Sequence, residues 1–187
     1  MSSINTARDE KTVTLQLQKA EVLLTIINYI KRLSTFGAMR GVILAGGKGL
    51  RLYPLTKVTN KHLLPVGREP MIYNPVKKLI EAGITDILIV SDAEQLGGIA
   101  HVLGSGVQFG CKFTYKAQDG ALGIAHALSL AEDFARNDKI VVILGDNVTT
   151  GSIKPHVEKF TQQPSGAKIL LKMVDNPAVS KQFPRHR

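Results

Sequence analysis

A short apolar run that leads straight into glycines limits the folds open to this chain. Residues 41–44 (GVIL) have the length and β-branched content of a buried strand, and residues 45–49 (AGGKG) follow without a break. Comparable apolar runs recur at 84–90, 113–116 and 140–144, with helix-like stretches between them. Such alternation is typical of parallel strands joined by right-handed crossover helices. We therefore expect an α/β fold, a three-layer α/β/α Rossmann-like nucleotide-binding domain with a mostly parallel sheet.

The remaining elements follow from apolar spacing and from glycine stops. A first helix is expected to follow Pro70 and to stop at Ala82-Gly83, and further helices are expected over 95–103 and 123–134 and through 153–160. The run 140–144 is predicted to be a fully buried strand, and 167–174 a last strand.

The chain divides into three parts by pattern. Residues 1–38 form an extension in which apolar residues recur at helical spacing, so we expect an amphipathic helix there. That helix packs on the domain or on a partner, lies on a membrane surface, or was added upstream of an older start at Met39. Residues 39–177 form the nucleotide-binding domain, and 178–187 an irregular basic tail.

Charge and composition limit the classes of ligand and partner that we expect for this chain. The chain has 24 Lys and Arg against 15 Asp and Glu, a net charge of +9, which favours anionic ligands. The excess is scattered and Trp is absent, so we expect no nucleic-acid binding. The lone Cys111 allows no internal disulfide and is expected to be a packed side chain rather than a reactive thiol. No signal peptide or apolar stretch of spanning length is recognisable, so we expect no stable membrane insertion. The single cysteine favours a cytoplasmic location.

Glycines 46, 47 and 49 are the first candidates for chemistry. Without side chains, such a loop lets backbone N–H groups surround phosphate oxygens, although a tight strand-to-helix turn needs the same residues. The segment matches neither the dinucleotide pattern G-x-G-x-x-G nor the phosphate-binding loop with Lys-Ser or Lys-Thr. Arg51 and Lys61 favour the phosphate interpretation, because a guanidinium and an ammonium together suit a triphosphate.

Asp146 is the second candidate, since it comes shortly after the apolar run 140–144. A carboxylate at the end of a buried strand needs a charged partner or a cation. Asp146 therefore either binds a metal ion or caps the turn that follows.

Two longer segments carry a resemblance to a known family. Residues 44–56 (LAGGKGLRLYPLT) with 60–66 (NKHLLPV) resemble the signature of the sugar-1-phosphate nucleotidyltransferases. Residues 70–73, 82–87, 103–106 and 144–147 (LGDN) are similar to the glucose-1-phosphate thymidylyltransferase branch, and the likeness covers 39–177.

This resemblance implies an enzyme that forms dTDP-glucose and pyrophosphate from dTTP and glucose 1-phosphate with Mg²⁺. A sugar-phosphate oxygen would attack the α-phosphorus in line, with Arg51 and Lys61 as catalytic residues. Asp146 would be the Mg²⁺ ligand, and Gln118 with Gly123 would read the base, which leaves UTP open beside dTTP. The full set of implied nucleotide-binding residues is Leu44, Ala45, Gly46, Gly47, Gly49, Gln118, Gly123 and Asp146.

The sequence departs from the family pattern at several positions, which include 119–122, 148–149, Leu50 and the segment after residue 177. Leu50 stands where the family has Thr or Ser, which removes one hydroxyl contact to phosphate. After residue 177 the family continues with a Glu-Lys sugar-binding pair and a second metal-binding aspartate, which 178–187 do not match. We therefore expect a domain incomplete at its C-terminus, with an uncovered sheet edge prone to homo-oligomer formation. The alternative to a working enzyme is a non-catalytic nucleotide-binding remnant or regulatory module.

The five histidines suggest no catalyst. His126 is predicted to be a helix-surface residue, and His62, His101, His156 and His186 lack a nucleophile or metal partner in the sequence pattern.

Overall fold

The computed structural model describes residues 39–120 and 122–171. The predicted helix within 1–38 and the tail at 178–187 lie outside these residues. None of the helices within the two ranges combines the length and the apolar character needed to cross a bilayer.

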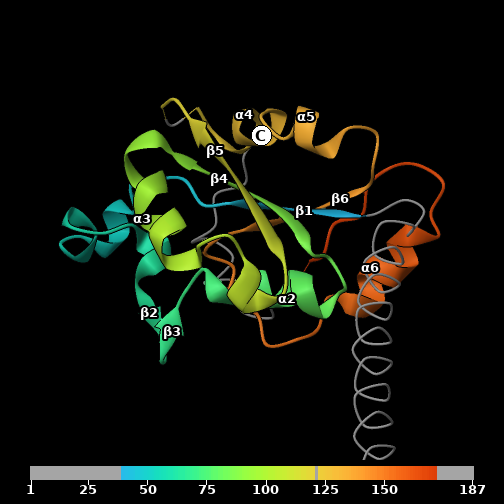
Figure 1. The fold of residues 1–187 in the computed structure, drawn as a ribbon, viewed down its shortest axis with the longest axis horizontal. Coiled ribbons are helices and arrows are strands. Elements are labelled where there is room, and N and C mark those ends of the chain that lie inside the picture. The colour runs from blue at the N-terminus through green and yellow to red at the C-terminus, as the bar shows by residue number, and fades with distance from the viewer. Residues whose placement is uncertain (1–38, 121, 172–187) are drawn as a thin grey trace, which may run out of the picture.

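The centre of the molecule is a four-stranded parallel sheet (Figure 1). Its strands are β1 (Arg40–Leu44), β4 (Asp86–Asp92), β5 (Lys112–Gln118) and β6 (Ile140–Leu144). They lie in the order β5-β4-β1-β6, and the last residue of β1 is level with Val90 and Leu144. The predicted parallel sheet is confirmed.

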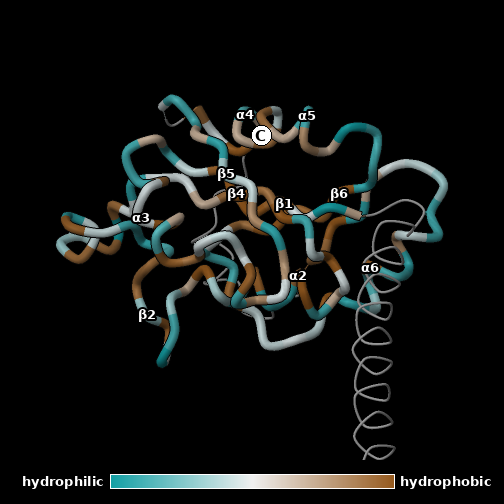
Figure 2. Tube along the Cα trace, in the orientation of Figure 1, coloured by the Kyte–Doolittle hydropathy of each residue, from teal (hydrophilic) through white to brown (hydrophobic). Residues whose placement is uncertain are grey.

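Helices cover both faces of this sheet, as the three-layer prediction requires. The helices α2 (Tyr73–Glu81), α3 (Ala93–Leu103) and α6 (Lys154–Thr161) pack on one face. The shorter helices α4 (Ile124–Ser129) and α5 (Glu132–Ala135) pack on the other face, which is uppermost in Figure 1. Hydrophobic residues concentrate along the strands between the layers (Figure 2).

Strand β1 shows how alternation builds the two cores. Ile43 packs in the cluster under α2 and α3, whereas Val42 and Leu44 pack with Ala127 of α4 on the opposite face. Successive side chains of a strand point to opposite faces, so a strand covered on both sides must be apolar throughout.

Three predictions about elements need correction. The stretch 123–134 forms two helices, α4 and α5, rather than one. Strand β6 is not fully buried, because it lies at the edge of the described sheet and Val142 is 37% exposed. Residues 167–171 of the predicted last strand form no strand, and Ile169 is 78% exposed; residues 172–174 lie outside the described ranges.

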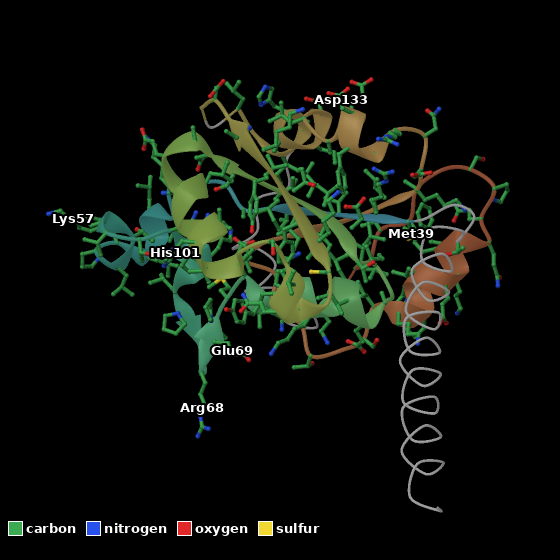
Figure 3. The ribbon with its side chains drawn as sticks, in the orientation of Figure 1. Met39, Lys57, Arg68, Glu69, His101 and Asp133 are labelled. Atoms are coloured by element: carbon green, nitrogen blue, oxygen red, sulfur yellow. The ribbon has the colours of Figure 1, made fainter. Side chains whose placement is uncertain are left out.

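A small hairpin and several short 3-10 helices were not predicted. The hairpin joins β2 (Pro65–Val66) to β3 (Glu69–Pro70), and Gly67, with φ 70°, supplies the left-handed turn residue between them. Arg68 and Glu69 lie at its tip, where it projects from the body of the molecule (Figure 3). The 3-10 helices are η1 (Leu50–Leu52), η2 (Leu55–Lys57), η3 (Lys61–Leu63) and η4 (Val107–Phe109).

Candidate functional site

The predicted site residues gather at one edge of the sheet, because the strands are parallel and their carboxyl ends meet there. Gln118 is the last residue of β5, the glycine segment follows β1, and Asp146 comes two residues after β6. Neighbouring strands are about 4.8 Å apart, so this edge spans about 14 Å from β5 to β6. Ligands of open parallel sheets bind at this end of the strands.

The glycine segment adopts conformations that other residues disfavour. Gly47 has φ 100° and Gly49 has φ 61°. A Cβ on Gly49 would lie 2.8 Å from Cγ2 of Thr56 and 3.1 Å from Cβ of Lys61. Glycine is therefore needed at position 49 for backbone conformation and for the close approach of Lys61. The hydroxyl of Thr56 donates to the carbonyl of Gly49 at 3.0 Å and holds the loop in this position.

Lys61 and Asp146 form a direct ion pair between η3 and the segment after β6. The Lys61 Nζ atom lies 2.7 Å from Asp146 Oδ2, although the residues are 85 positions apart in the chain. Their side chains are 20% and 39% exposed, so the pair is accessible to a ligand. Partly exposed pairs of this kind stabilise a fold by only about 1 kcal/mol or less, so stability alone does not explain the arrangement.

Asn60 and His62 are the two chain neighbours of Lys61, and both are buried. Asn60 Oδ1 accepts from the backbone N–H of His62 at 2.8 Å and lies 2.7 Å from His62 Nδ1. Because that amide oxygen can only accept, Nδ1 of His62 carries the proton in this arrangement. Asn60 Nδ2 donates to Gln95 Oε1 at 2.7 Å, which ties η3 to α3.

The pKa values at the site follow from burial and from Lys61. Burial lowers the pKa of His62 to about 4, with a further contribution from the Lys61 charge and an opposing one from Asp146. Burial alone would raise the pKa of Asp146, but the hydrogen bond and charge of Lys61 outweigh it, so that pKa lies below its ordinary value. At neutral pH the site therefore holds a neutral imidazole beneath an ionised pair.

Gln118 and Gly123 come together at the end of β5. Gln118 is 4% exposed, and its Nε2 lies 3.3 Å from the carbonyl oxygen of Gly123 and 3.0 Å from Nδ1 of His126. His126 is therefore half-buried against Gln118 rather than free on the helix surface, a contact that the sequence pattern did not indicate. Gly123 has φ 90°, which a residue with a side chain adopts only with strain.

Asp92 is a site residue that the sequence interpretation missed. It ends β4, and its Oδ2 accepts from the backbone N–H of Gly47 at 2.7 Å. Asp92 could have been found from the sequence as an acidic residue at the carboxyl end of the strand beside the glycine loop.

The other predicted residues lie around the same loop. Ala45 is fully buried, and its carbonyl accepts from the Ser91 hydroxyl at 2.9 Å; Leu44 is also buried. Arg51 is exposed in η1, and the structure shows no hydrogen bond or ion pair of its side chain with any described residue. The segment that carries Arg51 projects beyond the sheet edge (Figure 1).

One carboxylate, rather than a cluster, is the candidate metal ligand. In residues 39–120 and 122–171 no group of three or more His, Cys, Asp or Glu side chains could hold a metal ion. Mg²⁺ commonly takes one or two protein carboxylates and completes its shell with phosphate oxygens and water. The partly exposed Asp146 fits an ion that arrives with a nucleotide, not a metal centre built from protein ligands alone.

Cys111 offers no nucleophile to the site. Burial raises the pKa of its thiol to about 11, and Sγ lies 3.6 Å from the carbonyl oxygen of Gly106. This fits the packed side chain predicted from the sequence.

Comparison with known proteins shows the family. The family model described as nucleotidyl transferase matches residues 40–181. The chain belongs to the nucleotidyl transferase family. The resemblance carried by residues 44–66 and 144–147 is thereby confirmed.

Several relatives of this nucleotidyl transferase chain have names that state an activity. It is 41% identical over 140 residues to a glucose-1-phosphate thymidylyltransferase of Neisseria meningitidis, a match that covers 74% of this chain and 49% of that protein. It is 40% identical to the low-salt glycan biosynthesis nucleotidyltransferase Agl11 of Haloferax volcanii, covering 74% and 39%. The chain thus spans about half the length, or less, of these curated relatives.

Solved structures confirm the fold class. A Bacillus anthracis structure named for a glucose-1-phosphate thymidylyltransferase and containing sucrose aligns with a TM-score of 0.73 and 61% identity, over 75% of this chain and 57% of that one. A UDP-glucose pyrophosphorylase with UDP-glucose aligns with a TM-score of 0.56 and 24% identity, over 66% and 53%, and supports the fold alone.

Proposed function

We propose that this chain binds a pyrimidine nucleoside triphosphate with Mg²⁺ along the carboxyl edge of its sheet and transfers the nucleotidyl group to a sugar 1-phosphate. The nucleotide is dTTP, with UTP as the alternative, and the sugar is glucose 1-phosphate, giving dTDP-glucose and pyrophosphate. The observation that carries this proposal is the Lys61–Asp146 pair beside the glycine segment. The relatives named glucose-1-phosphate thymidylyltransferase support it.

The phosphates bind at the glycine segment. The backbone from Leu44 to Gly49 surrounds them, and the exposed Arg51 side chain neutralises the leaving pyrophosphate. Lys61 binds near the reacting phosphates, since its ammonium is already oriented by Asp146. A sugar-phosphate oxygen attacks the α-phosphorus in line, and the bond from that phosphorus to pyrophosphate breaks.

Asp146 would hold Mg²⁺, and the ion would supply positive charge to neutralise the phosphates. The lowered pKa of Asp146 supports this role, because the carboxylate stays ionised at any pH at which the nucleotide is fully charged.

The base binds at the end of β5. Nε2 of Gln118 is occupied by Gly123 and His126, which leaves Oε1 to accept from the imide N–H of thymine or uracil. Because thymine and uracil share this imide edge, Gln118 does not separate dTTP from UTP.

We propose a three-part organisation for the chain. Residues 39–177 form the nucleotide-binding domain, with 1–38 as an N-terminal extension and 178–187 as a basic tail. We place the chain in the cytoplasm, with no nucleic-acid partner and with self-association through the sheet edge.

Lys61→Gln tests the phosphate site, with Lys57→Gln as the matched control. Lys57 lies in η2, four residues earlier, and its side chain points away from the body of the molecule (Figure 3). A hydrogen bond to a charged group contributes about 1.5–3 kcal/mol, so Lys61→Gln should weaken dTTP binding about tenfold or more in a calorimetric titration with Mg²⁺. Lys57→Gln should leave the Kd unchanged, and equal effects of the two variants would contradict the assignment.

Pyrophosphate release then separates enzyme from binding module. The full chain with dTTP, glucose 1-phosphate and Mg²⁺ should release pyrophosphate only when both substrates are present. Binding of dTTP without release would support the nucleotide-binding module instead. If dTTP neither binds nor reacts, the proposal fails in both forms.

A further inference from the structure

We propose that Asp92 binds a hydroxyl group of the nucleotide's sugar and is a specificity-determining residue of this site. The inference rests on the proposed function, since it needs a nucleotide at the sheet edge. It assigns a role to a side chain that neither the sequence interpretation nor the comparisons single out.

The strand order places the sugar next to Asp92. Gln118, proposed to read the base, ends β5, and the glycine segment, proposed to hold the phosphates, follows β1. Strand β4 lies between those two strands, and Asp92 is its last residue. In a nucleotide the sugar joins the base to the phosphates, so a nucleotide laid along this edge has its sugar over β4.

The Asp92 side chain contacts the glycine segment instead of capping α3. Asp92 is the N-cap of α3, yet its side chain makes no capping hydrogen bond. Aspartate at this position ordinarily accepts from a backbone N–H of the first helical turn. Here Oδ2 instead accepts from the N–H of Gly47 at 2.7 Å, which joins β4 to the glycine segment.

The second carboxylate oxygen faces the space beside Gln118. A Cβ on Gly46 would lie 3.4 Å from Asp92 Oδ1 and 3.5 Å from Gln118 Oε1, so both oxygens border the space that glycine leaves open. Among the described residues, Asp92 Oδ1 has no hydrogen-bond donor. One oxygen thus fixes the carboxylate on the loop, and the other remains an unused acceptor.

An unused carboxylate oxygen selects a hydroxyl group rather than a phosphate. A sugar hydroxyl donates to it in a charge-assisted hydrogen bond, whereas a phosphate is repelled. Dinucleotide-binding folds place an acidic residue at an equivalent strand end to bind ribose. This site shares the geometry of those folds, with a glycine loop after one strand and a carboxylate near it, and the similarity supports the role of Asp92.

A competing explanation makes the opposite prediction. If the Asp92 carboxylate merely occupies the Gly47 amide in place of a phosphate, its removal should free that amide and reduce repulsion. Nucleotides with and without sugar hydroxyls would then both bind Asp92→Ala more tightly, and by the same factor.

The test compares two thymine nucleotides that differ only in their sugar hydroxyls. The Kd of the full chain is measured by calorimetry with Mg²⁺ for 5-methyluridine triphosphate, which has both hydroxyls, and for 2′,3′-dideoxythymidine triphosphate, which has neither. A hydrogen bond to a charged group predicts that the wild type prefers the first by about ten- to a hundredfold. In Asp92→Ala this preference should fall to about threefold or less.

Two further variants make the result decisive. Asp92→Asn keeps an oxygen for the Gly47 N–H but presents an uncharged NH₂ to the sugar, so its preference should lie between those of wild type and Asp92→Ala. Asp119→Asn removes the same charge from an exposed position next to Gln118 and should keep the wild-type preference. Circular dichroism checks that each variant is folded.

The outcomes separate this inference from the proposed function. An unchanged preference in both Asp92 variants, or equally tighter binding of both nucleotides, would overturn the role of Asp92 while leaving nucleotide binding intact. If the wild type binds neither nucleotide, the proposed function fails and this inference fails with it.

Discussion

His62 is a buried residue whose importance the sequence pattern could not show. His62 lies within the segment 60–66 that carries the family resemblance, but only the fold reveals that its ring packs against Gly145. Its burial lowers its pKa to about 4, so the folded chain keeps the ring neutral where the unfolded chain would protonate it.

This difference predicts an acid sensitivity of the fold. Between pH 6.5 and pH 4 the unfolded state binds more protons at His62 than the folded state, so stability falls as the pH is lowered through this window. The free energy of unfolding should drop by about 2 kcal/mol from pH 7 to pH 5 through this residue alone. Urea unfolding at the two pH values measures the drop.

The matched variants are His62→Gln and His101→Gln. His101 is exposed on α3 (Figure 3), so its replacement should preserve the pH dependence. In His62→Gln the drop in the free energy of unfolding from pH 7 to pH 5 should be smaller by about 2 kcal/mol. An identical pH dependence in wild type and His62→Gln would rule out the buried neutral imidazole.

At the scale of elements, the longer strands and helices could be predicted because each has a pattern of its own. The apolar runs of β1 and β4 and the glycine stop after α2 lie within a few residues of their predicted positions. The β2–β3 hairpin could not be predicted, because two-residue strands carry no periodicity. The exposure of β6 depends on the order of strands in the sheet, which no local pattern encodes.

The junction between β6 and η3 gives a prediction about packing. A Cβ on Gly145 would lie 2.7 Å from Cδ2 of His62 and 3.1 Å from Cβ of Ala45. Gly145→Ala should therefore destabilise the fold by about 1–3 kcal/mol and weaken dTTP binding, because the displaced ring moves Lys61 relative to Asp146. Urea unfolding and dTTP titration measure the two effects.

Gly97→Ala is the control with the opposite sign. Gly97 lies inside α3 with open space around its Cβ position, so alanine there should stabilise the fold by about 0.5–1 kcal/mol. Destabilisation by Gly97→Ala, or tolerance of Gly145→Ala, would contradict the packing around these two glycines.

At the scale of the whole molecule, the parallel sheet is what gathers residues from distant segments. Lys61 and Asp146 could be nominated from the sequence because each lies in a recognisable motif, but their contact depends on β1 and β6 being neighbours. Asp92 was missed for the same reason, since its contact with Gly47 joins β4 to the segment after β1. Association through the β6 edge, where Val142 is partly exposed, stays a prediction.

The central claim is that a nucleoside triphosphate lies along the carboxyl edge of this sheet, from Gln118 to Asp146. Its most direct test is the shift of assigned backbone amide NMR signals as dTTP and Mg²⁺ are added to the full chain. The account predicts that the largest shifts occur at Gly46, Gly47 and Gly49, with further shifts at Gln118 and Asp146. Shifts confined to other surfaces, with these amides unmoved at saturation, would contradict it.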